Sequence, residues 1–333
     1  GYAAHGLFQF LEQLAALQLP MFAATRAPGL PATMLAMLGA AMVLLPRGFY
    51  PRFAGLLLMI PMLLPVTSVL DHGDIQIDFL DVGQGLSTLL TTQEYQLVYD
   101  TGPGNGLDGE EAWSMVAGTL EPMIRASGRS PDLVVASHAD LDHAGGLQAL
   151  MALYPGASYI ASLPQERDGI RPCLAPAAWK VRSIEFRILH PTVGLPYLGN
   201  DSSCVISVKG EAASLLLSGD ISKPVERRLV NNGLGQHDIL TVPHHGSSTS
   251  SSGLLIKALD PDMALISAAM DNRFGFPRED VIDRYAQAQV RTLNTAQCGG
   301  IRITTSETGN YEVEFARNTR KAIWRWPPGM ACR

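Results

Sequence analysis

The sequence is poor in cysteine and in positive charge. Its four cysteines, Cys173, Cys204, Cys298 and Cys332, form no Cys-x-x-Cys pair and no dense framework, which excludes a zinc knuckle and a disulfide scaffold. One disulfide can form if the soluble part of the chain lies in the periplasm. The net charge of −6 excludes a broad basic surface along duplex DNA, so any contact with nucleic acid must be local.

Charged residues of either sign are also scarce, and this scarcity is concentrated near the N-terminus. They make up 17% of the chain, against 47% hydrophobic residues. Residues 27–46 and 53–70 contain none, and each run approaches the ~17–25 apolar residues that cross a bilayer as a helix. We predict two transmembrane helices, 27–46 and 53–70. The alternative is a pair of buried core helices, because three prolines would disturb a helix: Pro31, Pro61 and Pro65.

The short loop between these runs predicts the topology. It carries Arg47 and Arg52, and arginine-bearing short loops favour the cytoplasm. We therefore expect the residues after Leu70 to lie on the periplasmic side. Without an initiator methionine or a signal-peptide pattern, the sequence looks like the last part of a longer membrane protein.

The densest cluster of potential metal ligands follows an apolar run. We expect a buried strand at 133–136 and a helix at 147–153, and the turn between them carries His138, Asp140, Asp142 and His143. Imidazole nitrogens and carboxylate oxygens bind borderline or hard divalent ions, and a tight turn can direct alternate side chains at two adjacent metals. The alternative is a polar loop with an N-cap aspartate, which seldom concentrates so many ligand types.

The pattern His-x-Asp-x-Asp-His-x-Gly-Gly resembles the metal loop of the metallo-β-lactamase superfamily, whose usual form has His at the position of Asp140. With LDVGQG at 80–85 and PHHGS at 243–247, it resembles the nuclease-like domain of the ComEC family of DNA-uptake proteins. The likeness covers residues 75–316. It implies an αββα sandwich at 75–316 and the end of a channel domain at 1–70. Residues 317–333 hold five basic residues with Trp324 and Trp326, so we predict a basic aromatic tail there.

The resemblance also implies a two-metal site. Its ligands would be His138, Asp140, Asp142, His143, Asp220 and His245. Asp220, at the end of a buried strand, fits the bridging ligand, because a buried carboxylate is costly unless paired or bound to metal. Adjacent histidines on an extended backbone point in opposite directions, so one of His244 and His245 is expected to ligate. We favour His245 as the ligand, and assign His244 and Asp142 to catalysis.

Three positions depart from the family pattern. Where much of the superfamily has a His that completes the first site, this chain offers Asn200, Asp201 or Ser202 as a third ligand or substrate contact. Oxygen donors shift preference away from zinc, so we expect two divalent ions, with Mn²⁺ favoured over Zn²⁺ or Mg²⁺. Leu86 replaces an Asp and Phe276 replaces a His, which leaves open whether activity is reduced.

Four further residues are expected to contact substrate or to support the ligands: Asp81, Gln84, Asp100 and Ser247. The glycines around Gln84 either form a turn or present backbone N–H groups to a phosphate. Asp100 either orients a ligand histidine or caps its turn.

These features predict a metal-dependent phosphodiesterase or nuclease of a DNA-uptake protein in the bacterial inner membrane, degrading the strand that is not imported. Its partners would be single-stranded DNA, the membrane, and the remainder of the competence channel and uptake machinery. One alternative is a hydrolase of small esters, lactams or thioesters on the same fold, since fold does not fix substrate. Another is a gating module whose site has decayed. Metal content, and turnover of single-stranded DNA against a lactam, distinguish them.

Overall fold

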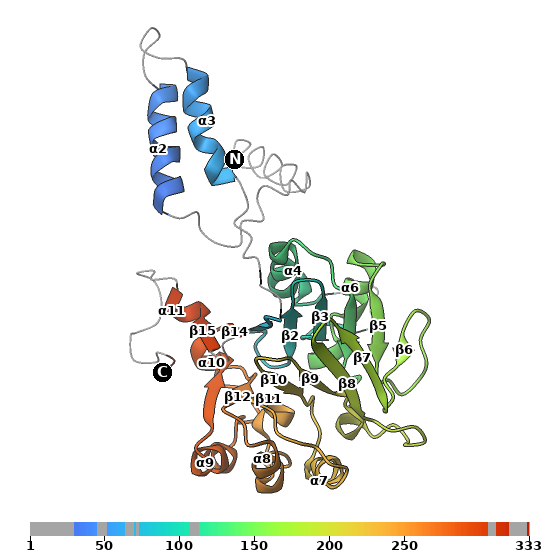
Figure 1. The fold of residues 1–333 in the computed structure, drawn as a ribbon. Coiled ribbons are helices and arrows are strands. Elements are labelled where there is room, and N and C mark those ends of the chain that lie inside the picture. Colours follow the sequence, from blue (N-terminus) through green and yellow to red (C-terminus); the bar gives the residue numbers. More distant parts are fainter. Residues whose placement is uncertain are drawn as a thin grey trace. The chain divides into compact units, whose positions relative to one another are not determined.

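The computed structural model describes residues 30–44, 52–63, 70, 73–106, 113–305, 311–319 and 332. They fall into two units, each described by itself (Figure 1). The N-terminal unit contains helix α2 (Leu30–Leu44) and helix α3 (Arg52–Leu63). Most of the predicted 317–333 tail lies outside the described residues.

Helix α2 lies within the first predicted span, and helix α3 begins at Arg52, one residue before the second. The two helices pack against each other. A Cβ on Gly55 would be 2.6 Å from the carbonyl oxygen of Gly39, so the two backbones approach too closely for a larger residue. Apolar side chains remain exposed on this pair, among them Leu44 at 83% and Phe53 at 68%. Among the residues described, no helix combines the length and the apolar character that a bilayer crossing requires.

Two mixed β-sheets form the other unit. The first has the order β15-β14-β1-β2-β3-β4-β5-β6, and the second has the order β13-β12-β11-β10-β9-β8-β7. The strands of the first sheet are β1 (Gln76–Phe79), β2 (Ser87–Thr91), β3 (Gln96–Thr101), β4 (Leu133–Ala136), β5 (Ser158–Ala161), β6 (Arg171–Pro172), β14 (Ile301–Thr305) and β15 (Tyr311–Phe315). Those of the second are β7 (Ala177–Val181), β8 (Ile184–His190), β9 (Val205–Lys209), β10 (Ser214–Leu217), β11 (Ile239–Thr241), β12 (Met263–Ile266) and β13 (Arg291–Asn294).

Helices cover the outer faces of both sheets (Figure 1). On the first sheet lie α4 (Glu121–Ser127) and α6 (Leu147–Leu153), whose apolar residues contact the outer side chains of β2, β3 and β4. On the second lie α7 (Lys223–Asn231), α8 (Gly253–Leu259) and α9 (Glu279–Gln287). The short helices are α5 (Leu141–Ala144), α10 (Thr295–Cys298) and α11 (Ala316–Thr319).

The main core lies between the sheets. Alternating residues of β1, such as Ile77 and Phe79, face Phe186 of β8 and Leu215 of β10 and their neighbours, and all four are almost fully buried. A strand directs successive side chains to opposite faces, so the other residues of each strand face the helices. The predicted αββα sandwich is thus confirmed.

A π-helical turn at Val116–Leu120 leads directly into α4. One local expectation needs correction. The cysteines form two disulfides rather than one, Cys173–Cys204 and Cys298–Cys332. Their sequence separations of 31 and 34 residues carry no information about which side chains meet in space.

Candidate metal centre

The candidate ligands lie where parallel strands end. Strands β3 and β4 are parallel in the first sheet, and β10, β11 and β12 are parallel in the second. Because the carboxyl ends of parallel strands meet at one edge, residues that follow them come together across the two sheets. His138 follows β4, Asp220 follows β10, and His244 and His245 follow β11.

The loop after β4 turns at once into α5. Asp140 occupies the N-cap position of α5, and its carbonyl oxygen accepts hydrogen bonds from the backbone of His143 and Ala144. Its carboxylate makes no capping hydrogen bond, contrary to the simplest reading of an N-terminal aspartate. Instead Asp140 Oδ2 lies 3.5 Å from His138 Nε2.

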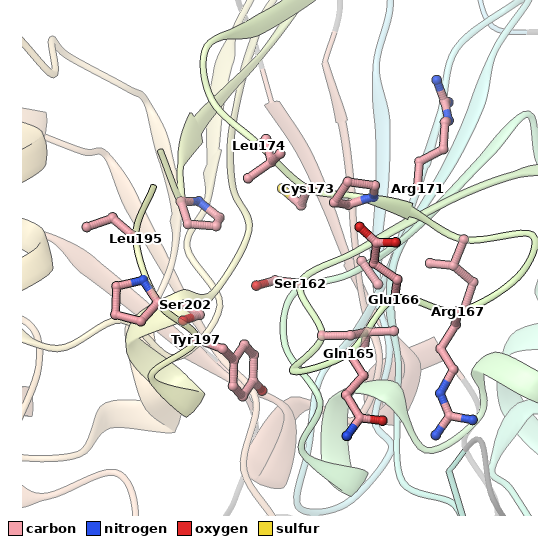
Figure 2. Close-up of a pocket in the computed structure, with 16 residues that line it drawn as sticks. Ser162, Gln165, Glu166, Arg167, Arg171, Cys173, Leu174, Leu195, Tyr197 and Ser202 are labelled. Carbon is pink, nitrogen blue, oxygen red and sulfur yellow. The ribbon is translucent and has the colours of Figure 1, made fainter. Parts of the chain in front are cut away.

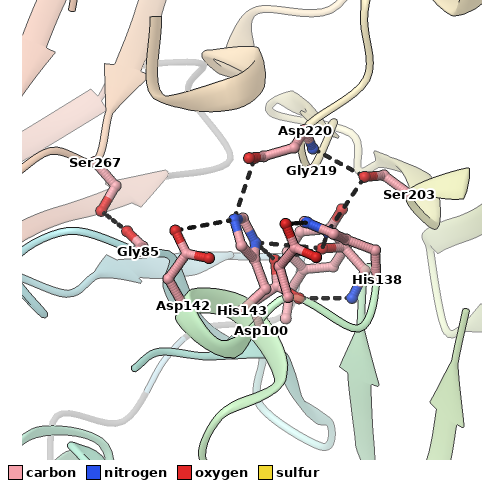
Figure 3. A network of polar contacts seen from close by, with 12 residues as sticks. Gly85, Asp100, His138, Asp142, His143, Ser203, Gly219, Asp220 and Ser267 are labelled. Atoms are coloured by element: carbon pink, nitrogen blue, oxygen red, sulfur yellow. Dashed lines mark hydrogen bonds and ion pairs between the residues drawn. The ribbon is translucent and has the colours of Figure 1, made fainter. Parts of the chain in front are cut away.

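Four side chains converge on a small volume: His245 and three that Figure 3 labels, Asp142, His143 and Asp220. His143 Nε2 lies 3.2 Å from Asp220 Oδ1 and 3.2 Å from His245 Nε2. His245 Nε2 lies 3.3 Å from Asp142 Oδ2 and 3.5 Å from Asp220 Oδ2. All of these except Asp142 are buried.

The opposite nitrogens of both imidazoles have fixed partners. His143 Nδ1 lies 2.8 Å from Asp100 Oδ2, and His245 Nδ1 lies 2.8 Å from the carbonyl oxygen of Ser267. Both partners can only accept, so each Nδ1 carries a proton and each Nε2 is directed toward the shared volume. Burial lowers the pKa of both imidazoles, but the nearby negative charge of Asp220 outweighs it and raises the pKa of each ring. The 3.2 Å approach of the two Nε2 atoms therefore requires positive charge, either on the rings themselves or on a metal cation bound to their lone pairs.

The electrostatics of the buried carboxylate agree with this picture. Burial by itself would raise the pKa of Asp220, but positive charge on His143 and His245 outweighs it and holds the pKa well below its ordinary value. Asp220 is therefore an anion in a nearly water-free setting. Such a group requires cationic partners.

His138 also has a buried polar atom that a cation would satisfy. Its Nδ1 lies 3.0 Å from Ser137 Oγ, whose own proton goes to Asp100 Oδ2 at 2.8 Å. The His138 ring is fully buried, and its Nε2 has no hydrogen-bond partner among the described residues. A buried imidazole nitrogen without a donor is costly, and a metal cation would relieve that cost.

The donor set therefore fits divalent cations. Two groups have ligand atoms within 4.8 Å of one another: His138, His143 and Asp220, and Asp142, His143 and His245. Imidazole nitrogens with carboxylate oxygens suit Zn²⁺, Mn²⁺ or a related ion. Asp140, whose side chain is 52% exposed, adjoins the first group through His138.

The adjacent histidines reach their positions differently from the prediction. The backbone of His244 and His245 is not extended but left-handed, with φ of 52° and 53°. Gly246, with φ of 83°, continues this conformation, which costs non-glycine residues ~1–3 kcal/mol each. The turn directs His245 into the centre and leaves His244 at its edge, where His244 Nε2 is 3.9 Å from Asp220 Oδ2.

The three residues predicted to complete the first metal site have different surroundings in the structure. Asn200 Nδ2 lies 3.3 Å from His244 Nε2, so Asn200 borders the centre. Asp201 accepts the backbone N–H of Ser222, and Ser202 Oγ accepts that of Leu198. Within the described structure, neither belongs to a candidate ligand group.

Three of the four predicted supporting residues also lie apart from the ligands. Asp81 pairs with Arg317 at 3.2 Å, Gln84 Oε1 accepts a long hydrogen bond from the backbone of Ala269, and Ser247 Oγ lies 3.0 Å from Thr249 Oγ1. Asp100 is different. It is fully buried and contacts His143 directly.

Some supporting residues were missed. Ser203 Oγ accepts the backbone N–H of Asp220 and lies 3.4 Å from His138 Nδ1, and Ser137 and Ser267 hold the other rings as described above. Serines at strand ends are common, and nothing in the sequence singles out Ser203 or Ser267. Ser137 could have been found, because it directly precedes the His-x-Asp-x-Asp-His pattern.

A pocket of about 130 Å³ lies beside the metal loop (Figure 2). Tyr197 lines it, and its hydroxyl accepts the backbone N–H of Ala139 at 3.0 Å. Figure 2 shows the side chains of Gln165 and Arg167 extending toward the same side as the Tyr197 hydroxyl. The hydrogen bond between Ala139 and Tyr197 connects the 191–197 segment to the loop that carries His138.

Comparison with known proteins gives consistent matches. The family model described as the metallo-beta-lactamase superfamily matches residues 80–269. Competence protein ComA of Neisseria gonorrhoeae is 32% identical over 92% of this chain and 43% of its own length. Recombination protein 2 of Haemophilus influenzae is 34% identical over 75% of this chain and 31% of its own length. The chain spans less than half of either relative.

Solved structures also match. The metallo-beta-lactamase fold protein YhfI from Bacillus subtilis is 12% identical with a TM-score of 0.42, over 69% of this chain and 99% of its own.

Proposed function

The chain belongs to the metallo-beta-lactamase superfamily, and from this premise we propose that it is a metal-dependent phosphodiesterase that hydrolyses DNA during DNA uptake. The predicted relation to competence proteins of the ComEC family is confirmed by the curated homologues. The fold and these homologues support a metal-dependent hydrolase in DNA uptake. Cleavage of one DNA strand is the finer step that we propose.

One observation carries the proposal: buried imidazole nitrogens and carboxylate oxygens converge on one small volume. His143 Nε2 lies 3.2 Å from His245 Nε2 and 3.2 Å from Asp220 Oδ1, which is within hydrogen-bonding range. Bound divalent ions would lower the pKa of water and offset the negative charge of a phosphodiester. Polar contacts from Asp100, Ser137 and Ser267 hold the rings in place before any ligand arrives, which is the pre-organisation that such catalysis needs.

Two side chains are placed to handle protons. Asp142 has a side chain that is 35% exposed, so one carboxylate oxygen can reach solvent and accept a proton from the attacking water. His244 is 26% exposed at the edge of the centre, where its imidazole can exchange a proton with the leaving oxygen. The Asn200 amide beside it can hold the ring or contact the substrate.

Membrane association and periplasmic placement belong to the same proposal. The exposed apolar residues of α2 and α3 support a lipid environment, and close approach at glycine is typical of helix packing in membranes. Two disulfides support an oxidising compartment for the following domain. Single-stranded DNA, the inner membrane and the rest of the competence channel would then be its partners.

The test uses the full chain purified in detergent. We expect bound divalent metal by elemental analysis, cleavage of single-stranded DNA, and higher activity with Mn²⁺ than with Zn²⁺. Asp142→Ala and His143→Ala should lower the metal content and abolish cleavage while the chain stays folded by circular dichroism. Lys257→Ala, on α8, is the matched control and should keep full activity.

Hydrolysis of a lactam or thioester without cleavage of DNA would replace the proposal with the small-substrate alternative. Absence of both metal and turnover would indicate the decayed gating module.

A further inference from the structure

Two stacked phenylalanines lie beside the candidate metal centre. Phe274 and Phe276 belong to the segment between β12 and α9, with ring centroids 5.5 Å apart and planes inclined by 16°. The Phe276 ring meets the His244 ring edge-on, with centroids 5.6 Å apart. His244 Nε2 is in turn 3.9 Å from Asp220 Oδ2. The His244 ring therefore lies between the aromatic pair and the candidate ligand Asp220.

These rings are not part of the core. Phe274 is 40% exposed and Phe276 is half-buried, whereas the large core side chains are almost fully buried. An exposed aromatic pair leaves apolar surface in water, which is unfavourable unless something covers it.

Two arginines accompany the rings. The Arg273 guanidinium carbon lies 4.7 Å from the centroid of Phe274, and that of Arg278 lies 5.7 Å from the centroid of Phe276. Both arginines are exposed. In a chain with a net charge of −6, two guanidinium groups on one aromatic pair form a local site for an anion that also carries a flat ring.

The segment that carries the rings is held in shape. The Asn272 side chain donates from Nδ2 to the carbonyl oxygen of Phe276 at 2.6 Å and accepts the backbone N–H of Phe276 at 2.9 Å. The Arg278 N–H donates to the carbonyl oxygen of Gly246, which ties the segment to the histidine turn. The rings are thus ordered before a ligand binds, which lowers the entropic cost of binding.

A hollow next to Phe276 completes the surface. It has a volume of about 270 Å³ and is lined by Phe276, Asn272, Asn294 and Gln297, among others. Amide side chains can donate to and accept from the edge of a base. Stacking surface, cations and amide groups are the components with which proteins bind single-stranded nucleic acid.

We propose that Phe274, Phe276, Arg273 and Arg278 form an aromatic platform that stacks an unpaired base of the DNA strand next to the phosphodiester being cleaved. The arginines contact the neighbouring phosphates. In a duplex the faces of the bases are already stacked on one another, so the platform selects single-stranded DNA. This inference rests on the proposed function, and it gives Phe276 a role in binding at the position where the resemblance to the ComEC family implies histidine.

The test measures binding of the full chain in detergent, with a metal chelator present so that no strand is cleaved. Phe274→Ala should weaken binding of a short oligothymidylate by roughly 5- to 150-fold, corresponding to ~1–3 kcal/mol for one stacked base. Binding of an abasic oligonucleotide of equal length should be unchanged. Phe274→Leu, which keeps apolar bulk but removes the aromatic face, should behave like Phe274→Ala.

Arg273→Gln should weaken binding of both oligonucleotides and reduce the salt dependence. The matched controls are Leu153→Ala, an exposed apolar residue of α6, and Arg187→Gln, an exposed arginine of β8. Both controls should bind like the parent chain.

Three outcomes would overturn the platform: equal binding of oligothymidylate by Phe274→Ala and the parent, equal losses for base-bearing and abasic strands, or a loss of binding to anionic vesicles with DNA binding intact. The last outcome would assign the rings to a membrane surface. If the parent cleaves no DNA with any metal but Phe274-dependent binding persists, the proposed hydrolysis fails and the platform stands.

Discussion

At the scale of single residues, Asp100 connects the two histidines of the metal loop. Its Oδ1 accepts the backbone N–H of Ser137 at 2.6 Å, and its Oδ2 accepts from Ser137 Oγ and from His143 Nδ1, both at 2.8 Å. Ser137 Oγ also lies 3.0 Å from His138 Nδ1. One buried carboxylate therefore fixes the orientation of both candidate ligand rings, as carboxylates behind ligating histidines do in metal sites.

We expect Asp100→Asn to weaken metal binding by about 10- to 100-fold, because the amide keeps the shape but removes the charge behind His143. Asparagine tolerates the left-handed backbone that Asp100 adopts, with φ of 60°, so the chain should remain folded. Competition with a fluorescent chelator measures the affinity. Asp238→Asn is the matched control, because Asp238 accepts two hydrogen bonds from Ser214 away from the centre. If both variants bind metal like the parent, Asp100 only caps its turn.

At the scale of elements, the turn between β1 and β2 supports the metal loop. The carbonyl oxygen of Asp142 accepts the backbone N–H of Leu86 at 3.0 Å, and Ser267 Oγ donates to the carbonyl oxygen of Gly85. A Cβ on Gly85 would collide with the carbonyl oxygen of Asp142, and the φ of Gly85 is 136°. The glycine thus permits the close approach of two segments, which accounts for part of the LDVGQG motif without a phosphate contact.

Gly85→Ala should therefore displace Asp142, with at least a tenfold loss of metal affinity and a destabilisation of about 1–3 kcal/mol. Thermal unfolding with and without metal measures both effects. Gly156→Ala is the control, because a Cβ there meets no atom within 4 Å. Unchanged metal affinity in Gly85→Ala would show that this turn does not position the metal loop.

At the scale of the whole molecule, the proposed membrane association leads to a prediction of the side of the membrane that the sandwich would occupy. The arginines of the loop between the two apolar runs, Arg47 and Arg52, predict a cytoplasmic loop, and an even number of crossings would then place the following domain in the periplasm. The Cys173–Cys204 and Cys298–Cys332 bonds are consistent with that compartment.

A reporter fused after Arg333 tests this placement. A periplasmic phosphatase should be active there, and a fluorescent protein that matures only in the cytoplasm should be dark. The reverse pattern would place the domain inside the cell, where it meets only strand already imported, and degradation of the excluded strand would have to be abandoned. The same fusions after residue 50 serve as the control and should show the opposite pattern.

The sequence by itself determined the fold class and most of the candidate ligands. Alternating apolar strands and strand-to-helix turns are local patterns, and His138, Asp142 and His143 lie within one turn, so their proximity follows from the chain itself. The predicted order of motifs likewise placed Asp220 and the histidine pair at strand ends. These predictions needed no contact between distant residues.

The tertiary structure decided the rest, because it depended on contacts between residues far apart in sequence. His143 and His245 are separated by 102 positions, and only the meeting of the two sheets directs His245 inward and leaves His244 beside Phe276. Three other features also depend on contacts between residues distant in sequence: the hydrogen bond of Asp201 to Ser222, the pairing of the cysteines, and the hydrogen bond of His245 to the Ser267 carbonyl. Backbone groups and spatial neighbours leave no signature in residue type, so sequence patterns could not predict them.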